Sequence, residues 1–80
     1  MGINEELKKV MIDLTKEELD KHHIWYRKDV KEALYYMNKY TYMEELYNEA
    51  LVGGTIPHSV GKVIRFMYYK SKEHLQVEED

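Results

Sequence analysis

Hydrophobic residues recur at steps of three and four along most of the chain, which is the period of an amphipathic helix. The first such face lies near the N-terminus and consists of Ile3, Leu7, Val10, Met11 and Leu14. Asn4 is a residue type that often caps a helix, so we expect it to begin this one. Thr15 and Glu18 have the spacing of a capping box. That spacing predicts an interruption at residues 13–15 and a second helix from Lys16.

The second helix is expected to run from Lys16 towards Arg27. Its inner face would consist of Leu19, His23, Tyr26 and Val30. Alternatively, residues 16–39 form one continuous helix, about 36 Å long at 1.5 Å per residue. That length is large for a domain of 80 residues, so a bend or break between Trp25 and Asp29 is favoured. Trp25, the only tryptophan, is expected to anchor the core.

Two interpretations of the middle of the chain remain open. In the first, a helix with Val30, Ala33, Leu34 and Met37 facing inward ends near residue 40. Thr41 and Glu44 then form a capping box for the next helix. The inner face of that helix would consist of Met43, Leu46, Tyr47, Ala50 and Leu51. In the second, residues 30–52 form a single helix, because an unbroken stripe at helical spacing joins Ala33, Tyr36, Tyr40, Met43, Tyr47 and Ala50.

The pair Gly53 and Gly54 is expected to end the helix that precedes it, with Gly54 at positive φ. Thr55 or Ile56 would cap a last helix, and Pro57 suits its first turn because no amide hydrogen is needed there. The apolar side of this helix consists of Val60, Val63, Ile64 and Met67. Its other side carries His58, Lys62, Arg65, Tyr69 and Lys72, with no acid in that stripe.

Length and composition predict one small all-α domain. The chain has 80 residues, and residues 76–80 resemble an acidic tail, so we expect a bundle of four or five short helices over residues 1–75. The net charge is -3, but residues 55–74 carry four Lys or Arg against one Glu. The absence of cysteine excludes a disulfide scaffold and leaves the compartment open. No apolar stretch reaches membrane-spanning length and the N-terminus does not resemble a signal peptide, so a cytoplasmic protein is expected.

Catalytic and metal-binding patterns are weak in this sequence. No glycine-rich phosphate loop precedes a helix, neither His58 nor Ser59 has an identifiable triad, and no pair of carboxylates is singled out. His22 and His23 are adjacent, and adjacent helical side chains point about 100° apart, so they are poorly placed to chelate one ion. We therefore expect a protein that is no enzyme, has no cofactor or metal, and has no small-molecule substrate or membrane partner.

Ala50, Gly54, Val60 and Val63 stand at the spacing of a helix-turn-helix unit, and the stretch at 42–72 resembles that unit in small DNA-binding proteins. The resemblance implies a recognition helix from Pro57 to about Lys72. It also implies a transcription-regulating protein that binds double-stranded DNA through side chains reaching phosphates and bases. The residues so implied are His58, Ser59, Lys62, Arg65, Tyr69 and Lys72.

The same stretch departs from that pattern in three places. Thr55 and Glu49 stand where apolar residues are common, and Gly61 would weaken the last helix by roughly 0.5–1 kcal/mol relative to alanine. A more local resemblance covers Ile56–Arg65, IPHSVGKVIR, which is similar to the C-terminal end of the Hha/YmoA family of nucleoid-protein modulators. That family implies a small helical protein that acts by binding a DNA-binding partner.

Eight tyrosines in 80 residues favour an alternative function, a protein-interaction module that does not bind nucleic acid. Exposed tyrosine is enriched in protein interfaces, so Tyr35, Tyr36 and Tyr42 are candidate contacts with a partner or a second copy of the chain. Adjacent residues cannot share one helix face, so one member of Tyr35–Tyr36 and of Tyr68–Tyr69 should face away from the core. The basic side of the last helix would then be only a solvated face of a bundle.

Overall fold

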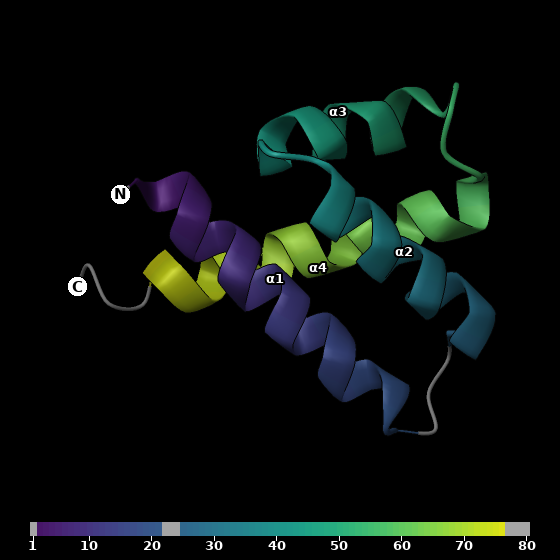
Figure 1. Cartoon of the computed structure of the whole chain (residues 1–80), viewed down its shortest axis with the longest axis horizontal. Coiled ribbons are helices and arrows are strands. Elements are labelled where there is room, and N and C mark those ends of the chain that lie inside the picture. Colours follow the sequence, from purple (N-terminus) through teal and green to yellow (C-terminus); the bar gives the residue numbers. More distant parts are fainter. Residues whose placement is uncertain (1, 22–24, 77–80) are drawn as a thin grey trace.

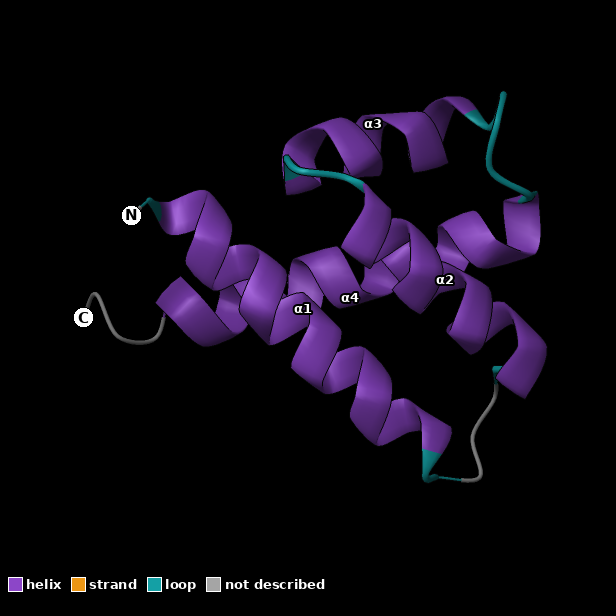
Figure 2. Cartoon of the chain, in the orientation of Figure 1, coloured by secondary structure: helices purple, strands orange, loops and turns teal. Residues whose placement is uncertain are grey.

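The computed structural model describes residues 2–21 and 25–76, and over these residues it consists of four helices without a strand. They are α1 (Ile3–Leu19), α2 (Arg27–Lys39), α3 (Met43–Val52) and α4 (His58–Gln76) (Figures 1 and 2). The predicted all-α class is therefore confirmed. His22, His23 and residues 77–80, which include most of the predicted acidic tail, lie outside the described residues.

Helix α4 is the element around which the bundle packs, because α1, α2 and α3 all lie against it. In Figure 1 both α1 and α2 cross in front of it. The predicted apolar side of α4 is confirmed: Val60, Val63, Ile64 and Met67 are buried. The rest of the core comes from the other helices, the turn before α4 and one further residue of α4, and consists of Leu7, Met11, Val30, Ala33, Met37, Met43, Leu46, Ala50, Ile56 and Tyr68.

Helix α1 is not interrupted at residues 13–15, so that prediction is wrong. Thr15 is fully buried within the helix, and its hydroxyl donates a hydrogen bond to the Met11 carbonyl at 2.6 Å. Its Oγ1 also lies 3.2 Å from Met37 Sδ on α2. The Thr15 hydroxyl has its hydrogen-bond partner, the Met11 carbonyl, inside the same helix. It therefore does not cap a new helix.

The connection between α1 and α2 begins earlier than expected. Helix α1 ends at Leu19, and α2 starts at Arg27, so residues 16–39 are not one helix. The Arg27 guanidinium donates to the Leu19 carbonyl across this connection. Tyr26, predicted to face inward, is exposed. Trp25 is half-buried, and its ring centroid lies 5.5 Å from that of Phe66 on α4, as expected for an anchor.

Helices α2 and α3 are separate, because Tyr40 and Tyr42 both have extended backbone. The Thr41 side chain does not cap α3; the cap comes from α1. Asn4 Oδ1 accepts a hydrogen bond from the Met43 amide, and Asn4 Nδ2 donates to the Thr41 carbonyl, both at 2.9 Å. The prediction that Asn4 caps its own helix is thus wrong, and α1 begins after Gly2 without a side-chain cap.

The turn between α3 and α4 is built on Gly53, not on Gly54. Gly53 has φ +76°, the left-handed conformation that ends many helices, and Gly54 does not have positive φ, which corrects the prediction. Helix α4 begins directly after Pro57, whose carbonyl accepts a hydrogen bond from the Gly61 amide at 2.8 Å. Leu51, predicted to face inward, is exposed at the end of α3.

Gly61 lies where α3 and α4 approach most closely. A Cβ atom at this position would stand 3.0 Å from the Ala50 carbonyl oxygen and 3.5 Å from Ala50 Cβ. The glycine that seemed only to weaken the last helix therefore permits the two backbones to pack together. Ala50 and Gly61 are the small residues of this crossing.

Candidate functional site

The predicted DNA-binding stripe of α4 has an exposed N-terminal part and a C-terminal part whose side chains contact other groups of the chain. His58, Ser59 and Lys62 are exposed on the first turns of the helix. Arg65 is half-buried, and its Nε donates to the Gly61 carbonyl at 3.4 Å. Tyr69 is exposed, but its hydroxyl shares a hydrogen bond with that of Tyr47.

Lys72, the last residue of the stripe, is half-buried on α4. Its Nζ lies 5.4 Å from the centroid of the Tyr68 ring, in the geometry of a cation–π contact. Lys62, Arg65 and Lys72 therefore do not present three free cations to one partner. Two of them are occupied by contacts within the chain.

Two residues on the outside of α4 were not singled out from the sequence. Phe66 is exposed, and Lys70 Nζ lies 5.8 Å from its ring centroid. Lys62, Phe66 and Lys70 follow one another at four-residue steps, and that spacing could have indicated a shared outer face.

Three tyrosines form an aromatic cluster within the contact between α3 and α4. The rings of Tyr47 and Tyr68 are stacked with centroids 4.4 Å apart, and Tyr69 meets Tyr47 edge-on at 5.5 Å. The hydrogen bond with Tyr69 raises the pKa of Tyr47, and desolvation raises it further. Tyr68 is buried while Tyr69 is exposed, which confirms the expectation for this adjacent pair.

The three tyrosines predicted for a protein interface lie at two separate places. Tyr35 is exposed and Tyr36 is half-buried on α2, with their ring centroids 5.4 Å apart. Lys39 Nζ lies 5.8 Å from the Tyr35 ring. Tyr42 is exposed in the connection before α3 and borders a groove that the other two do not reach.

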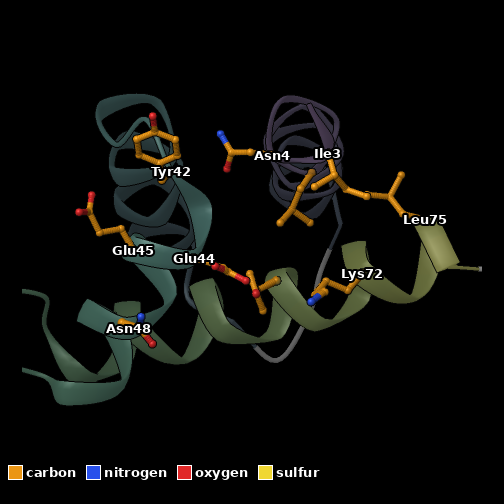
Figure 3. A pocket seen from close by; sticks show the side chains of 10 residues that line it. Ile3, Asn4, Tyr42, Glu44, Glu45, Asn48, Lys72 and Leu75 are labelled. Carbon is orange, nitrogen blue, oxygen red and sulfur yellow. The ribbon is translucent and has the colours of Figure 1, made fainter. Parts of the chain in front are cut away.

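This groove has a volume of about 620 Å³ and lies between α1, α3 and α4 (Figure 3). In Figure 3, α4 runs beneath it, with α1 on one side and α3 on the other. Its apolar lining consists of Ile3, Leu7, Tyr42, Tyr68 and Leu75. Its polar lining consists of Asn4, Glu44, Glu45, Asn48 and Lys72.

Among residues 2–21 and 25–76, the groove lies where three helix ends meet. The first turns of α1 and α3 and the last turns of α4 contribute all but one of the lining residues. Leu7 and Tyr68 are almost fully buried within it, whereas Ile3 is 68% and Tyr42 60% exposed. Asn4 fixes the distance between α1 and α3 through its two hydrogen bonds to the connection before α3.

Comparison with known proteins adds no assignment. No protein family matches the chain, and neither a curated protein nor a solved structure is significantly similar to it. In residues 2–21 and 25–76 no three His, Cys, Asp or Glu side chains are gathered in a way that could hold a metal ion. Over the same residues no helix is both long and apolar enough to cross a bilayer. The function is therefore argued from the groove and the outer side of α4.

Proposed function

We propose that this chain is a protein-interaction module whose groove binds an amphipathic helix of a partner protein. The observation that carries the proposal is the exposure of Ile3 and Tyr42 on the rim of a groove whose interior is apolar. Large apolar side chains gathered around a concave surface are typical of protein-binding sites. An amphipathic helix that lays its apolar face into such a groove is a recurring mode of recognition.

The walls of the groove favour binding because they are already in place. Asn4 joins α1 to the start of α3, and Lys8 Nζ donates to the Tyr40 carbonyl at 2.8 Å beside it. Tyr68 is held between Tyr47 and Lys72. A site whose side chains are fixed before binding loses less conformational entropy on association. A larger share of the free energy from apolar contact therefore contributes to the affinity.

The test is a selection of amphipathic helical peptides from a phage-displayed library on the wild-type chain. The selected peptides are then measured against an Ile3→Ser, Tyr42→Ser double variant. Both side chains are exposed, so the variant should fold normally, and we expect binding to weaken about tenfold or more because two apolar contacts are lost.

The matched control is a Val52→Ser, Tyr35→Ser double variant, which removes two equally exposed apolar side chains outside the groove. Binding to this control should equal binding to the wild-type chain. The proposal is wrong if the selection yields no binder, or if the peptides bind both double variants equally well.

Double-stranded DNA is the second candidate partner, and the exposed N-terminal part of α4 favours it. His58, Ser59 and Lys62 stand there with no acid in the first turn, at the positive end of the helix dipole. A shift assay at two salt concentrations tests it. Each phosphate contact contributes about 0.9 to the log–log salt slope, so Lys62→Ala should reduce the slope by about one. Lys16→Ala, an exposed lysine of α1, should not change it.

A further inference from the structure

We propose that the helix bound in the groove is basic along the flank that faces α3. This inference rests on the proposed function and adds the charge of the partner to it. Its basis is the distribution of charge around the groove, where two carboxylates stand on the α3 side and the one lysine of the lining, Lys72, stands on α4.

The α3 side of the groove is acidic. Glu44 and Glu45 both line it and are exposed, and the remaining charged residue of α3 is also a glutamate, Glu49. Neither Glu44 nor Glu45 forms an ion pair with a residue that the structure describes. The first turn of α1, on the other side, adds Glu5 next to the lining residues Ile3 and Asn4.

Lys8 and Lys72 keep their positive charge, but neither forms an ion pair with Glu44 or Glu45. Lys8 Nζ is bound to the Tyr40 carbonyl, and Lys72 Nζ lies over the Tyr68 ring. Figure 3 shows Glu45 and Asn48 on the α3 side, with Ile3 and Leu75 across the groove and Lys72 below them on α4. The lining is therefore acidic along α3 and apolar where α1 meets the end of α4.

These two sides define the partner's surface. An apolar stripe at helical spacing would cover Ile3, Leu7 and Leu75. Lys or Arg on the adjacent flank would meet Glu44 and Glu45, and glutamine or serine there would meet Asn48. A flank of Asp or Glu would instead bring like charges together, which disfavours that partner.

Two synthetic helical peptides with one apolar stripe test the inference. One carries lysines along a single flank, the other carries glutamates there, and the opposite flank is glutamine in both. Exposed ion pairs are individually weak, so the lysine peptide should bind the wild-type chain about fivefold more tightly at low salt. The difference should shrink as salt rises. The double variant Glu44→Lys, Glu45→Lys should reverse the preference.

A second double variant, Asp13→Lys with Glu17→Lys, makes the same change in net charge on exposed positions of α1 outside the groove and should keep the wild-type preference. The inference would be overturned if the wild-type chain bound the two peptides with equal affinity. It would also be overturned if the double variant Glu44→Lys, Glu45→Lys still preferred the lysine peptide. If Ile3→Ser still weakens both peptides, the groove remains the binding site and only the charge assignment fails. If neither peptide binds the wild-type chain, both proposals are wrong.

Discussion

A single glycine conformation ends α3. Gly53 has φ +76°, and its amide donates to the Glu49 carbonyl at 3.0 Å, so the chain can leave the helix and turn towards α4. A side chain at this φ brings Cβ close to the following carbonyl group. Gly54, the next residue, has no such requirement because its φ is not positive.

Gly53→Ala should lower the free energy of unfolding by about 1 kcal/mol, because alanine resists the left-handed region. Apart from the adjoining residues, nothing lies within 4 Å of the added Cβ at either glycine, so the two substitutions differ in local backbone conformation and not in contacts with the rest of the chain. Gly54→Ala is the matched control and should leave stability unchanged or raise it slightly. Urea denaturation measures both, and equal losses would show that the turn does not depend on Gly53.

The hydroxyl of Tyr47 provides a test at high pH. Its hydrogen bond with Tyr69 raises its pKa, so the folded chain holds this proton more tightly than the unfolded chain, in which tyrosine titrates near pH 10. The free energy of unfolding should therefore be highest below pH 10 and fall as pH rises through the pKa of folded Tyr47.

Tyr69→Phe should lower the pKa of Tyr47 towards 10 and reduce that alkaline loss of stability. Carbon-13 NMR of the tyrosine Cζ atoms follows the titration of Tyr47 by itself. Tyr35→Phe, on α2, is the control and should leave the titration of Tyr47 where it is. An unchanged Tyr47 titration in Tyr69→Phe would mean that the hydrogen bond does not form in solution.

At the scale of elements, the crossing of α3 and α4 depends on two small residues. A Cβ at Gly61 would stand 3.0 Å from a backbone oxygen of Ala50, and a helix backbone cannot rotate away as a side chain can. Gly61→Val should lower the free energy of unfolding by about 2 kcal/mol, because the two helices must separate.

Gly61→Ala should be milder, because the better helix propensity of alanine, worth about 1 kcal/mol, opposes the contact. Thermal or urea unfolding gives the order of the two variants. If Gly61→Ala were more stable than the wild-type chain by that full amount, α3 and α4 would not approach closely at this point.

The connection between α2 and α3 is held by α1. Asn4→Ala removes two hydrogen bonds at once, to the Met43 amide and the Thr41 carbonyl, and should lower the free energy of unfolding by about 1 kcal/mol. Asn38→Ala is the matched control, since the Asn38 amide donates only to the Leu34 carbonyl of its own helix. Hydrogen exchange at the Met43 amide should accelerate in the first variant alone, and equal exchange in both would contradict the cap.

At the scale of the whole molecule, the exposed groove should produce weak self-association when no partner is present. A stable interface needs about 800 Å² per partner, which is about one seventh of the 5624 Å² accessible surface of this chain. Sedimentation equilibrium at high concentration should show a dimer that Tyr42→Ser weakens and Tyr35→Ser does not. A monomer at every concentration would remove the self-association and leave the partner helix as the occupant of the groove.

The sequence by itself determined the fold class and most of the core, because helical periodicity is a local property. Four apolar residues of α4, Val60, Val63, Ile64 and Met67, are buried as their spacing predicts. On α2, Val30, Ala33 and Met37 follow the same rule, whereas Leu34, also predicted to face inward, is only half-buried. A side chain's direction on a helix depends only on its position, so no knowledge of the neighbouring elements is needed.

The tertiary structure decided where α1 ends and what caps α3, whereas the glycine pair already marks the end of α3 in the sequence. Thr15 and Glu18 have the spacing of a cap, yet Thr15 is buried against Met37 in mid-helix. The start of α3 is capped by Asn4, which lies 39 residues away in the chain. A capping pattern identifies residue types that can form a capping hydrogen bond. Which of these hydrogen bonds forms depends on how distant elements pack.

The groove likewise has no signature in the sequence. Its apolar residues, Ile3, Leu7, Tyr42, Tyr68 and Leu75, come from three helices and a connection, and no spacing relates the residues of one helix to those of another. The basic stripe of α4 could be predicted as one helix face, but Arg65 and Lys72 are half-buried and each contacts another residue of α4. Charge along a helix is fixed by sequence, whereas the contacts that each charged side chain makes are fixed by the folded structure.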